Sequence, residues 1–335
     1  MEKKDLLKDP VKHIDIKSFD SGDIIEAMKD MSFTSRDTAR AAEILNTMIN
    51  DKDCTIILCI AGSTSAAGCM QIYVDMVKCN MVDAIVSTGA AIVDMDFFEA
   101  LGFRHYKAQQ SVDDEVLREL HIDRIYDTLI DEDQLQICDE TIKKIADSLP
   151  ARPYSSREFI KEMGRYLTDN ARKPDSLVQA AYENNVPIFC PAFSDSSAGF
   201  GLVKHQAENE ASHVCIDCVK DFRELTEIKI KSPVSGLFMI GGGVPKNFAQ
   251  DTVICAEILG HHTEMHKYAV QITIADVRDG ALSGSTLKEA RSWGKIDKGY
   301  EQMVYAEASS VLPLIVSYVY HRRDWQKRNK RMFDF

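Results

Sequence analysis

The sequence predicts an α/β protein built on a doubly wound, mostly parallel β-sheet, and three observations carry this prediction. Short apolar runs rich in β-branched residues alternate with longer helical patterns along most of the chain. Within each run the apolar character is continuous, which is typical of strands that are covered on both faces. Strand and helix also follow one another in order, as an open sheet with helices on both faces requires.

The elements can be placed in chain order. Six runs are predicted strands: CTIILCI from Cys54, DAIVST from Asp83, VPIFC from Val186, HVCID from His213, GLFMIG from Gly236 and YAVQITI from Tyr268. Helices are predicted over residues 65–79, 155–167 and 247–259, the second opening with the capping-box pair Ser155 and Glu158. Residues 111–149 are acidic and less strand-like, which indicates an insertion or a covering segment.

Composition limits the class of protein. The 335 residues are 45% apolar and 27% charged, with a formal net charge of −12. An acidic chain repels nucleic acid and anionic membranes, and it weakly favours cationic ligands. No apolar run approaches the ~20 residues of a membrane span, and the charged N-terminus lacks a signal-peptide core. The nine cysteines lie mostly in apolar contexts, which predicts free thiols and a cytoplasmic location.

Ligands of open α/β sheets bind beyond the carboxyl ends of the strands, so the loops that follow strands are candidate sites. Residues 61–68, AGSTSAAG, carry Ser63, Thr64 and Ser65, and could cradle a phosphate at a helix start. Small residues at such a turn also serve packing alone, and the motif is not GxGxxG. In residues 87–96, Thr88 and Gly89 could approach a ligand, and Asp94 or Asp96 could accept from its hydroxyls; the alternative is an ordinary helix cap.

The third loop contains three consecutive glycines, Gly241, Gly242 and Gly243, directly after a predicted buried strand. Glycines in series cost backbone entropy and offer no side chain to bury, so packing alone is a poor explanation for them. Close approach of the backbone to a ligand is the interpretation that we favour.

Residues 275–299 form a polar segment that contains Glu289, Trp293 and Lys295. A lone lysine is usually solvent-exposed. A lysine held against an aromatic wall loses water, however, and its amine can then act as a nucleophile.

Two further groups resemble metal or redox motifs only superficially. His261, His262 and His266 lack the glutamate of HExxH. Cys215 and Cys218 form the chain's one CxxC, without a second at metal spacing, and a structural role is the simpler interpretation. No metal site is predicted.

The order of CTIILCIAGSTSAAG, NMVDAIVSTGA, VPIFCPAFSDSSAG, GGGVPK and SWGKI is similar to the deoxyhypusine synthase family, in register over residues 54–320. The resemblance extends to a bacterial, homospermidine synthase-like branch. It implies a Rossmann-like NAD-binding fold and a homotetramer with active sites between subunits. The expected division is an N-terminal helical segment (1–50), one NAD-binding domain (51–320) and a basic tail (321–335), the tail being a solvated helix end rather than a nucleic-acid contact.

The resemblance also implies a mechanism. NAD takes hydride from spermidine, the imine loses diaminopropane, and a lysine captures the aminobutyl group as a Schiff base for transfer to an acceptor amine. Lys295 matches the catalytic lysine, Trp293 the aromatic wall and Glu289 an amine-binding carboxylate. The positions expected around the cofactor are Ser63, Thr64, Ser65, Thr88, Gly89, Asp195, Gly241, Gly242, Gly243, Asp279 and Ser283.

Three departures from the family pattern concern the substrate. Phe200 and Leu282 replace two amine-binding acids, and Asn247 replaces a histidine that assists proton transfer. An ammonium that loses its carboxylate partner loses about 1.5–3 kcal/mol. We therefore expect an acceptor that is a small amine such as putrescine, giving homospermidine. The alternatives are a true deoxyhypusine synthase acting on a translation-factor lysine, a non-catalytic NAD-binding subunit, and an NAD-dependent amine dehydrogenase.

Overall fold

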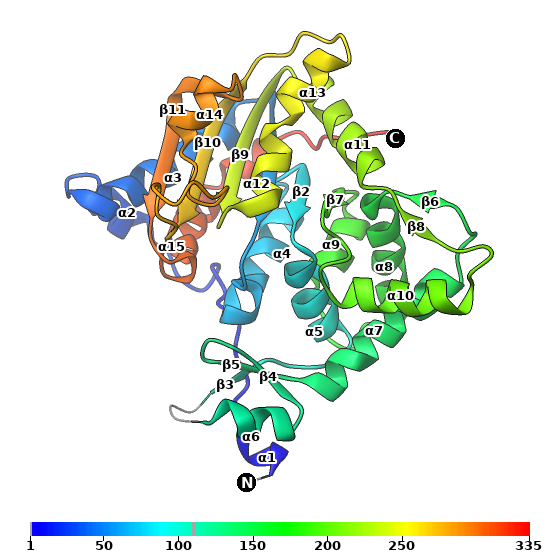
Figure 1. The fold of residues 1–335 in the computed structure, drawn as a ribbon. Helices are drawn as coiled ribbons and strands as arrows, with labels where there is room; N and C mark the ends of the chain where they lie inside the picture. The colour runs from blue at the N-terminus through cyan, green and yellow to red at the C-terminus, as the bar shows by residue number, and fades with distance from the viewer. Residues whose placement is uncertain (1, 109–111) are drawn as a thin grey trace.

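The computed structural model describes residues 2–108 and 112–335 and is organised around one six-stranded sheet (Figure 1). Its strands are β1 (Cys54–Ile60), β2 (Ala84–Ser87), β7 (Ile188–Phe189), β9 (Val234–Ile240), β10 (His266–Thr273) and β11 (Ile296–Tyr305). The order is β11-β10-β9-β1-β2-β7, and every pairing is parallel. Counted along the chain, this is the 3-2-1-4-5-6 order of the Rossmann fold, which confirms the predicted fold class.

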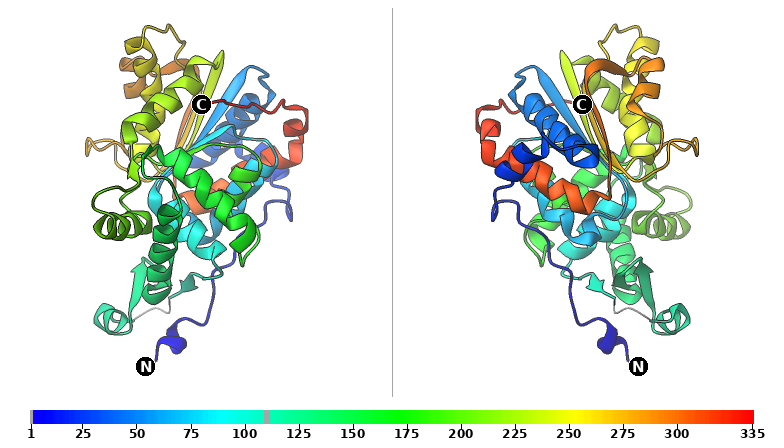
Figure 2. Two further views of the ribbon diagram at one scale, coloured as in Figure 1. Left: turned by 90° about the vertical axis from the view of Figure 1, so that its right-hand side faces the viewer. Right: turned by 90° about the vertical axis from the view of Figure 1, so that its left-hand side faces the viewer.

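Both faces of the sheet are covered by helices, as the continuous apolar runs predicted. Along β1, Ile56 and Leu58 join one hydrophobic cluster, whereas Ile57 and Cys59 join the other. The first cluster packs under α3 (Phe33–Asn50), α4 (Met70–Lys78) and α15 (Ala308–Arg322). The second packs under α11 (Cys218–Ile230), α12 (Gly243–Gln250) and α14 (Leu287–Ser292). The side views of Figure 2 show the two helical layers on opposite sides of the sheet.

The middle of the chain adds a second group of elements beside and below the sheet (Figure 1). Its helices are η2 (Ala90–Phe97), α5 (Phe98–Ala100), α6 (Asp114–Glu119), α7 (Glu132–Asp147), α8 (Ser156–Asn170), α9 (Leu177–Glu183) and α10 (Ser197–Glu208). A small antiparallel sheet contains β3 (Tyr106–Lys107), β5 (Thr128–Asp131) and β4 (Ile122–Ile125). The acidic segment therefore contains two short strands and a long helix; its first residue, Ser111, lies outside the described residues.

The remaining elements are short. They are α1 (Lys3–Leu6), α2 (Gly22–Met28), η1 (Ser65–Cys69), α13 (Thr252–Ile258), η3 (Asp324–Lys327), and the strand pair β6 (Pro153–Tyr154) and β8 (Cys215–Ile216). The helix expected over 65–79 is divided into η1 and α4, with Gly68 at φ +100° between them. The helix expected over 247–259 begins earlier, at Gly243, and is interrupted at Asp251.

The capping box at the start of α8 is confirmed, but two strand predictions were wrong. The HVCID run forms β8, which pairs with β6 outside the main sheet and is only half-buried. Strand β11 was missed because its sequence, IDKGYEQMVY, is largely polar, and most of its side chains remain exposed or half-buried. It is an edge strand, so the continuous apolar pattern of the buried strands does not extend to it.

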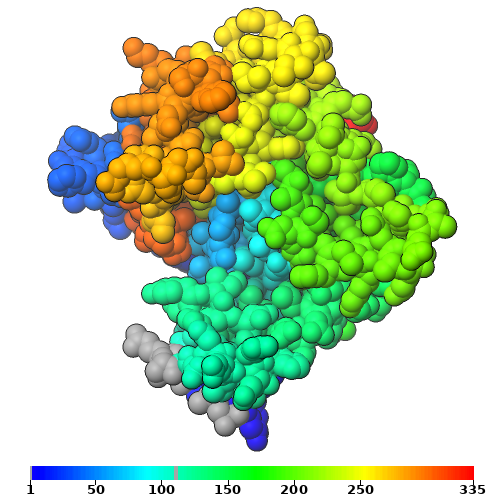
Figure 3. Space-filling view, in the orientation of Figure 1, coloured from blue at the N-terminus to red at the C-terminus, as the bar shows by residue number. Residues whose placement is uncertain are grey.

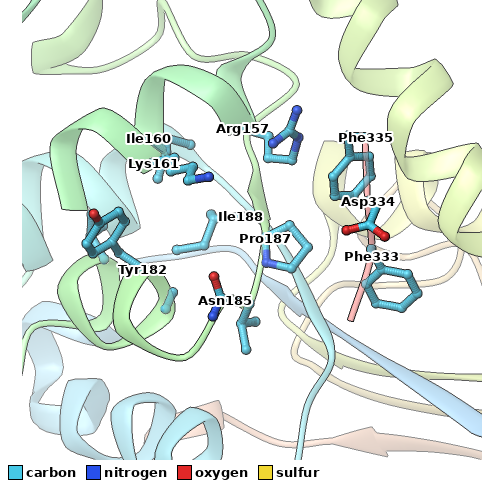
Figure 4. A pocket seen from close by; sticks show the side chains of 13 residues that line it. Arg157, Ile160, Lys161, Tyr182, Asn185, Pro187, Ile188, Phe333, Asp334 and Phe335 are labelled. Atoms are coloured by element: carbon cyan, nitrogen blue, oxygen red, sulfur yellow. The ribbon is translucent and has the colours of Figure 1, made fainter. Parts of the chain in front are cut away.

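The C-terminal tail is not solvated throughout, which corrects the prediction for residues 321–335. The guanidinium of Arg328 is almost fully buried and is paired with the carboxylate of Asp83, and it donates to the carbonyl of Cys54 at 2.9 Å. Phe335 lies edge-on to Phe189 of β7, and Arg157 stacks over its ring. Figure 4 shows the last three residues beside Arg157 and the start of β7.

The metal-like and redox-like motifs have ordinary surroundings. His266 is fully buried, and its ring nitrogens contact the hydroxyl of Ser235 and the carbonyl of Ala249. Cys215 and Cys218 are free thiols. Among the described residues no group of three or more potential metal ligands occurs. None of the helices in that part of the chain is long and apolar enough to span a membrane.

Candidate active site

The loops after β1 and β9 meet where the strand order reverses, which is the ligand position of doubly wound sheets. The amide of Ala61 donates to the carbonyl of Ile240 at 2.9 Å, so the two loops leave the sheet together. A cavity of about 270 Å³ lies beside them. It is lined by the small residues that follow β1, by the end of β10 and by the turn between β4 and β5. Figure 3 shows a recess between the teal β4–β5 region and the orange segments above it.

The three glycines after β9 have packing reasons that the sequence did not reveal. Gly241 has φ +76°, and a Cβ there would lie 2.8 Å from the carbonyl oxygen of Ala61. A Cβ on Gly242 would lie 2.5 Å from the Cα of Ser283. The expectation that packing does not explain these glycines is therefore wrong for two of the three. Gly243, at φ +62°, begins α12, and a Cβ there would be in ordinary contact with the hydroxyl oxygen of Ser283, at 3.9 Å.

The hydroxyl residues after β1 divide into three environments. Ser63 is half-buried and lines the cavity. The hydroxyl of Thr64 is hydrogen-bonded to that of Tyr73 at 2.6 Å and so faces the core. The hydroxyl of Ser65 is buried and has no hydrogen-bond partner among the residues that the structure describes.

These features fit the phosphate-bearing part of a dinucleotide. Two turns of small residues leave room for close approach, and both lead into helix starts with unpaired backbone N–H groups. The unpartnered hydroxyl of Ser65 is a further polar group at one of these turns.

The loops after β2 and β7 form a second part of the candidate site. The Thr88 amide donates to Ile60 at 3.1 Å, which holds this loop beside β1. A Cβ on Gly89 would lie 2.5 Å from the hydroxyl oxygen of Ser196, so this glycine is required by contact with the next loop. Asp195 stands exposed in that loop, immediately before α10.

The two acids that follow β2, Asp94 and Asp96, have different surroundings. Asp96 is buried and accepts from the amides of Leu177 and Val178, so it anchors α9. Asp94 accepts one amide hydrogen bond, from Ser197 at 2.7 Å. Burial raises the pKa of Asp94 to about 6, despite that hydrogen bond. The sequence singled out both acids as possible acceptors from the hydroxyls of a ligand, and that role remains a prediction for Asp94.

Lys295 is the centre of the third part of the candidate site. It precedes β11, and its backbone carbonyl accepts from the amide of His266 at the start of β10. The Lys295 side chain is almost buried, and its Nζ lies 2.5 Å from Oδ1 of Asp251. The same Nζ donates to Oδ1 of Asn247 at 3.3 Å and lies 5.3 Å from the ring centroid of Trp293.

This arrangement brings together three of the predicted residues and one that was missed. Asn247 and Asp251 lie one helical turn apart along α12 and its end, and Asn247 donates to Asp251 at 2.7 Å. The i, i+4 spacing of Asn247 and Asp251 was the available signal. Lys295 lies at the amino end of β11, unlike the three loops, which follow strands.

Two buried polar side chains hold residues 281–285 near the glycine loop. Lys246 donates to the carbonyl oxygens of Leu282, at 3.0 Å, and Ser285. Burial lowers the pKa of Lys246 to about 8. Gln271 of β10 donates to the carbonyls of Gly241 and Ser283 at 2.9 and 3.0 Å. Neither residue was predicted, and both hold residues 281–285 against α12 and β10.

Glu289 and Asp279 have local partners. Glu289 accepts from the Thr286 amide at 2.6 Å as part of a capping box, and this hydrogen bond lowers the pKa of its carboxyl group. Asp279 accepts from the Ala281 amide at 2.7 Å within an exposed turn. Their predicted roles toward amine and cofactor remain predictions.

Several large apolar side chains around the site are exposed. Trp293 is 69% exposed, Phe200 66% and Leu282 43%. Phe200 belongs to α10, whereas Leu282 and Trp293 lie on either side of α14, so each is separately available for contact with another molecule.

Comparison with known proteins shows the family. The family model described as "Deoxyhypusine synthase" matches residues 23–319. A deoxyhypusine synthase-like protein of Coxiella burnetii is 65% identical over 332 residues, which cover 99% of this chain and 94% of the relative. One from Caulobacter vibrioides is 63% identical, covering 98% and 91%. A protein of Methanosarcina mazei named "Probable deoxyhypusine synthase 2" is 36% identical, covering 97% and 94%.

The fold also matches a solved structure from Entamoeba histolytica that is named as a deoxyhypusine synthase. The TM-score is 0.59 at 22% identity, and the match covers 93% of this chain and 97% of the other. At this identity the likeness concerns the fold alone.

Proposed function

The chain belongs to the deoxyhypusine synthase family, a family of aminobutyl transferases, and on that premise we propose that it transfers an aminoalkyl group between small polyamines. The reaction uses bound NAD and a covalent intermediate on Lys295. Spermidine or a related polyamine is the donor, and a small amine such as putrescine is the acceptor, which gives homospermidine.

One observation carries the proposal: the nearly buried amine of Lys295, held between a carboxylate, an amide oxygen and an indole ring. Most lysines lie on the surface with their ammonium groups in water. A lysine that is withdrawn from water and oriented by fixed partners suits nucleophilic attack on an imine carbon.

The contacts suggest a role for each side chain. Asp251 lies close enough to take the proton that the Lys295 ammonium must lose before its amine can attack. Asn247 orients the amine through its Oδ1 and is held by Asp251 through its Nδ2. The indole of Trp293 excludes water from one side and favours cations over its face.

The covalent steps balance without a further reactant. NAD, when bound beside the loops that follow β1, β2 and β9, would supply the redox chemistry as acceptor of hydride from the carbon beside the donor's secondary amine and as donor of hydride for the final imine. Lys295 adds to the donor imine and expels diaminopropane, so that the aminobutyl group is carried on its nitrogen. The acceptor amine then displaces Lys295, whose nitrogen regains its proton from Asp251.

The residues around the substrate favour a small acceptor. Phe200 and Leu282 occupy positions where the family's amine-binding acids are expected, and both are apolar and exposed. Asp251 offers a carboxylate beside the nucleophile instead, which was absent from the predicted set. A rebuilt set of charges of this kind changes which amine binds and in which position.

We further propose a homotetramer with the sites between subunits. The exposed apolar side chains of Trp293, Phe200 and Leu282 support this arrangement, because a second copy would cover them and exclude water from the amine site.

Mass spectrometry of amines tests the proposal. The purified chain is mixed with NAD and spermidine, with and without putrescine, and Lys295→Ala is compared with Lys288→Ala, an exposed lysine on α14. We expect homospermidine only with NAD, with Lys288→Ala active and Lys295→Ala inactive. Full activity of Lys295→Ala would contradict the mechanism.

A true deoxyhypusine synthase is the second candidate, supported by the name of the relative from Methanosarcina mazei. It would transfer label from spermidine into protein, and only with a translation factor present. Net accumulation of NADH would instead indicate an amine dehydrogenase. NAD binding without any new amine or labelled protein would indicate a non-catalytic subunit.

A further inference from the structure

A second cavity lies far along the chain from Lys295, between the extended N-terminal segment and the residues that follow α5 and α8. Residues 10–13, 102–104 and 172–174 line it together with Glu99, and its volume is about 480 Å³. This volume falls in the range of about 300–1,000 Å³ that holds a whole small-molecule ligand. None of the predicted catalytic or cofactor residues lines this cavity.

The lining is strongly cationic, although the chain as a whole is acidic. Lys12, Arg104, Arg172 and Lys173 surround the cavity, and Glu99 is the one acid among its lining residues. The formal net charge of the whole chain is −12. Four basic side chains gathered around one cavity are therefore a local reversal of charge.

The carboxylate of Glu99 already interacts with three other side chains. Its carboxylate accepts from His13 at 2.7 Å and from His105 at 2.8 Å, and it is paired with Lys173. Burial opposes ionisation of this carboxyl, but the hydrogen bonds from His105 and His13 outweigh it and hold the pKa of Glu99 well below its usual range. These partners already balance the charge of Glu99, so this carboxylate does not neutralise Lys12, Arg104 or Arg172.

The remaining donors have no partners in the part of the chain that the structure describes. The side chains of Lys12, Arg104 and Arg172 make no hydrogen bond or ion pair with any residue of 2–108 or 112–335. In the same ranges, Nδ1 of His13 is buried without a hydrogen-bond partner, while its Nε2 is held by Glu99. Buried polar atoms in native proteins usually have a partner, so an unpartnered one beside a cavity points to a ligand.

The backbone makes room for one of these arginines. Gly102 has φ +98°, and a Cβ there would lie 3.0 Å from Cβ and 3.2 Å from Cδ of Arg172. The Arg172 amide also donates to the carbonyl of Ala100 at 2.8 Å, which fixes the start of its side chain beside this glycine. The position of Arg172 is therefore built into the turn.

We propose that this cavity binds a small anion that carries two or more phosphate groups. Guanidinium groups bind phosphate oxygens through two parallel hydrogen bonds, and lysines add charge without fixed direction. The basic side chains come from three separate segments around a cavity of this volume, which suits several linked phosphates better than one. The site is separate from the proposed amine chemistry, because cationic amines would be repelled from it.

Isothermal titration calorimetry of the full chain tests the site. Tripolyphosphate, ATP and inorganic phosphate are each titrated at about 50 mM salt, where charges are weakly screened. Saturating NAD is present in one series, so that binding of the probe in this cavity can be distinguished from binding at the proposed cofactor loops. The variant Arg104→Gln/Arg172→Gln is compared with Arg36→Gln/Arg118→Gln, which removes the same charge from exposed positions elsewhere.

We expect tripolyphosphate to bind one to one, with a Kd below about 1 mM. Binding should be unaffected by NAD and weakened roughly tenfold or more in the Arg104/Arg172 variant. Tighter binding of ATP than of tripolyphosphate would identify a nucleotide; equal binding would identify the phosphate chain as the recognised group. Inorganic phosphate should bind more weakly than either.

Three results would overturn the proposal. The first is that tripolyphosphate gives no heat with the unmodified chain. The second is that both double variants bind it equally more weakly than the unmodified chain does. The third is that the unmodified chain and both double variants bind it with equal affinity. Dissociation of an oligomer by Arg104→Gln/Arg172→Gln, without any anion binding by the unmodified chain, would also overturn it. That result would assign these arginines to an acidic surface of a second copy. Thermal unfolding of each variant establishes that it is folded, and Gly102→Ala supplies an independent change that presses on Arg172 without removing charge.

Discussion

The neighbours of Lys295 come from far away in the sequence. Asn247 precedes it by 48 positions, and Asp251 lies one turn further along the same helix. The sequence singled out Lys295, Trp293 and Asn247 through local motifs and a family resemblance. The i, i+4 spacing from Asn247 placed Asp251 on the same helix face, but no local pattern states that the end of this helix meets the residue before an unpredicted edge strand.

Asp251→Asn tests the proton-accepting role. The amide keeps the shape but cannot take a proton, and a charge-assisted hydrogen bond worth about 1.5–3 kcal/mol is lost. We expect kcat/KM for amine transfer to fall roughly 10- to 150-fold, because no group at this position can then take the proton from the amine. Glu257→Gln, an exposed acid on α13, is the control. An unchanged kcat/KM in Asp251→Asn would contradict the role.

Asp94 makes folding stability depend on pH. Its pKa is raised to about 6 by burial, against an ordinary value of 3.8. The folded state therefore binds the proton more tightly, and this contribution is complete below about pH 4 and is lost as pH rises through 6. Relative to Asp94→Asn, the unmodified chain should lose about 2–3 kcal/mol of unfolding free energy between pH 4 and 6. Urea unfolding at several pH values measures the free energy of unfolding of both proteins. The same pH dependence in the unmodified chain and in Asp94→Asn would contradict the raised pKa.

At the scale of elements, the buried strands were predictable and the edges were not. β1, β9 and β10 are continuous apolar runs, and each formed where the sequence indicated. β11 is paired with another strand on one side only, and most of its side chains stay in contact with water, so its sequence does not need to be a continuous apolar run. HVCID has an apolar strand pattern, but a two-residue pairing with β6 takes it outside the sheet. Pairing partners are a tertiary property that periodicity does not encode.

The C-terminal tail is an element whose role depends on one buried ion pair. Arg328 and Asp83 are both almost fully buried, and removal of one partner leaves an unpaired charge in the core. Arg328→Ala should lower the free energy of unfolding by about 3–5 kcal/mol. Arg331→Ala, which removes one exposed hydrogen bond to Lys52, should cost far less. Urea denaturation compares the two; equal, small losses would mean that the tail is dispensable.

At the scale of the whole molecule, the site contains more exposed apolar surface than a finished active site should. The side chains of Phe200, Leu282 and Trp293 are all exposed on one chain. The sequence could indicate which residues surround the site through resemblance. It could not indicate what covers them, because that depends on a second molecule.

Phe200→Glu tests the proposed assembly. If a second copy covers this side chain, a buried carboxylate without a partner would weaken the contact by several kcal/mol. Light scattering should give about four times 37.6 kDa for the unmodified chain and a smaller mass for the variant. Val219→Glu, an equally exposed position on α11, is the control, and equal masses for all three proteins would contradict the assignment of this surface.

Borohydride trapping tests the central claim most directly, because it asks where the transferred group is carried. The chain is incubated with NAD and spermidine, without acceptor, then reduced and digested, and the peptides are examined by mass spectrometry. The mechanism predicts an aminobutyl adduct on Lys295, dependent on NAD and discharged by putrescine before reduction. Formation of homospermidine without an adduct on Lys295, or with one on Lys246 instead, would contradict the account.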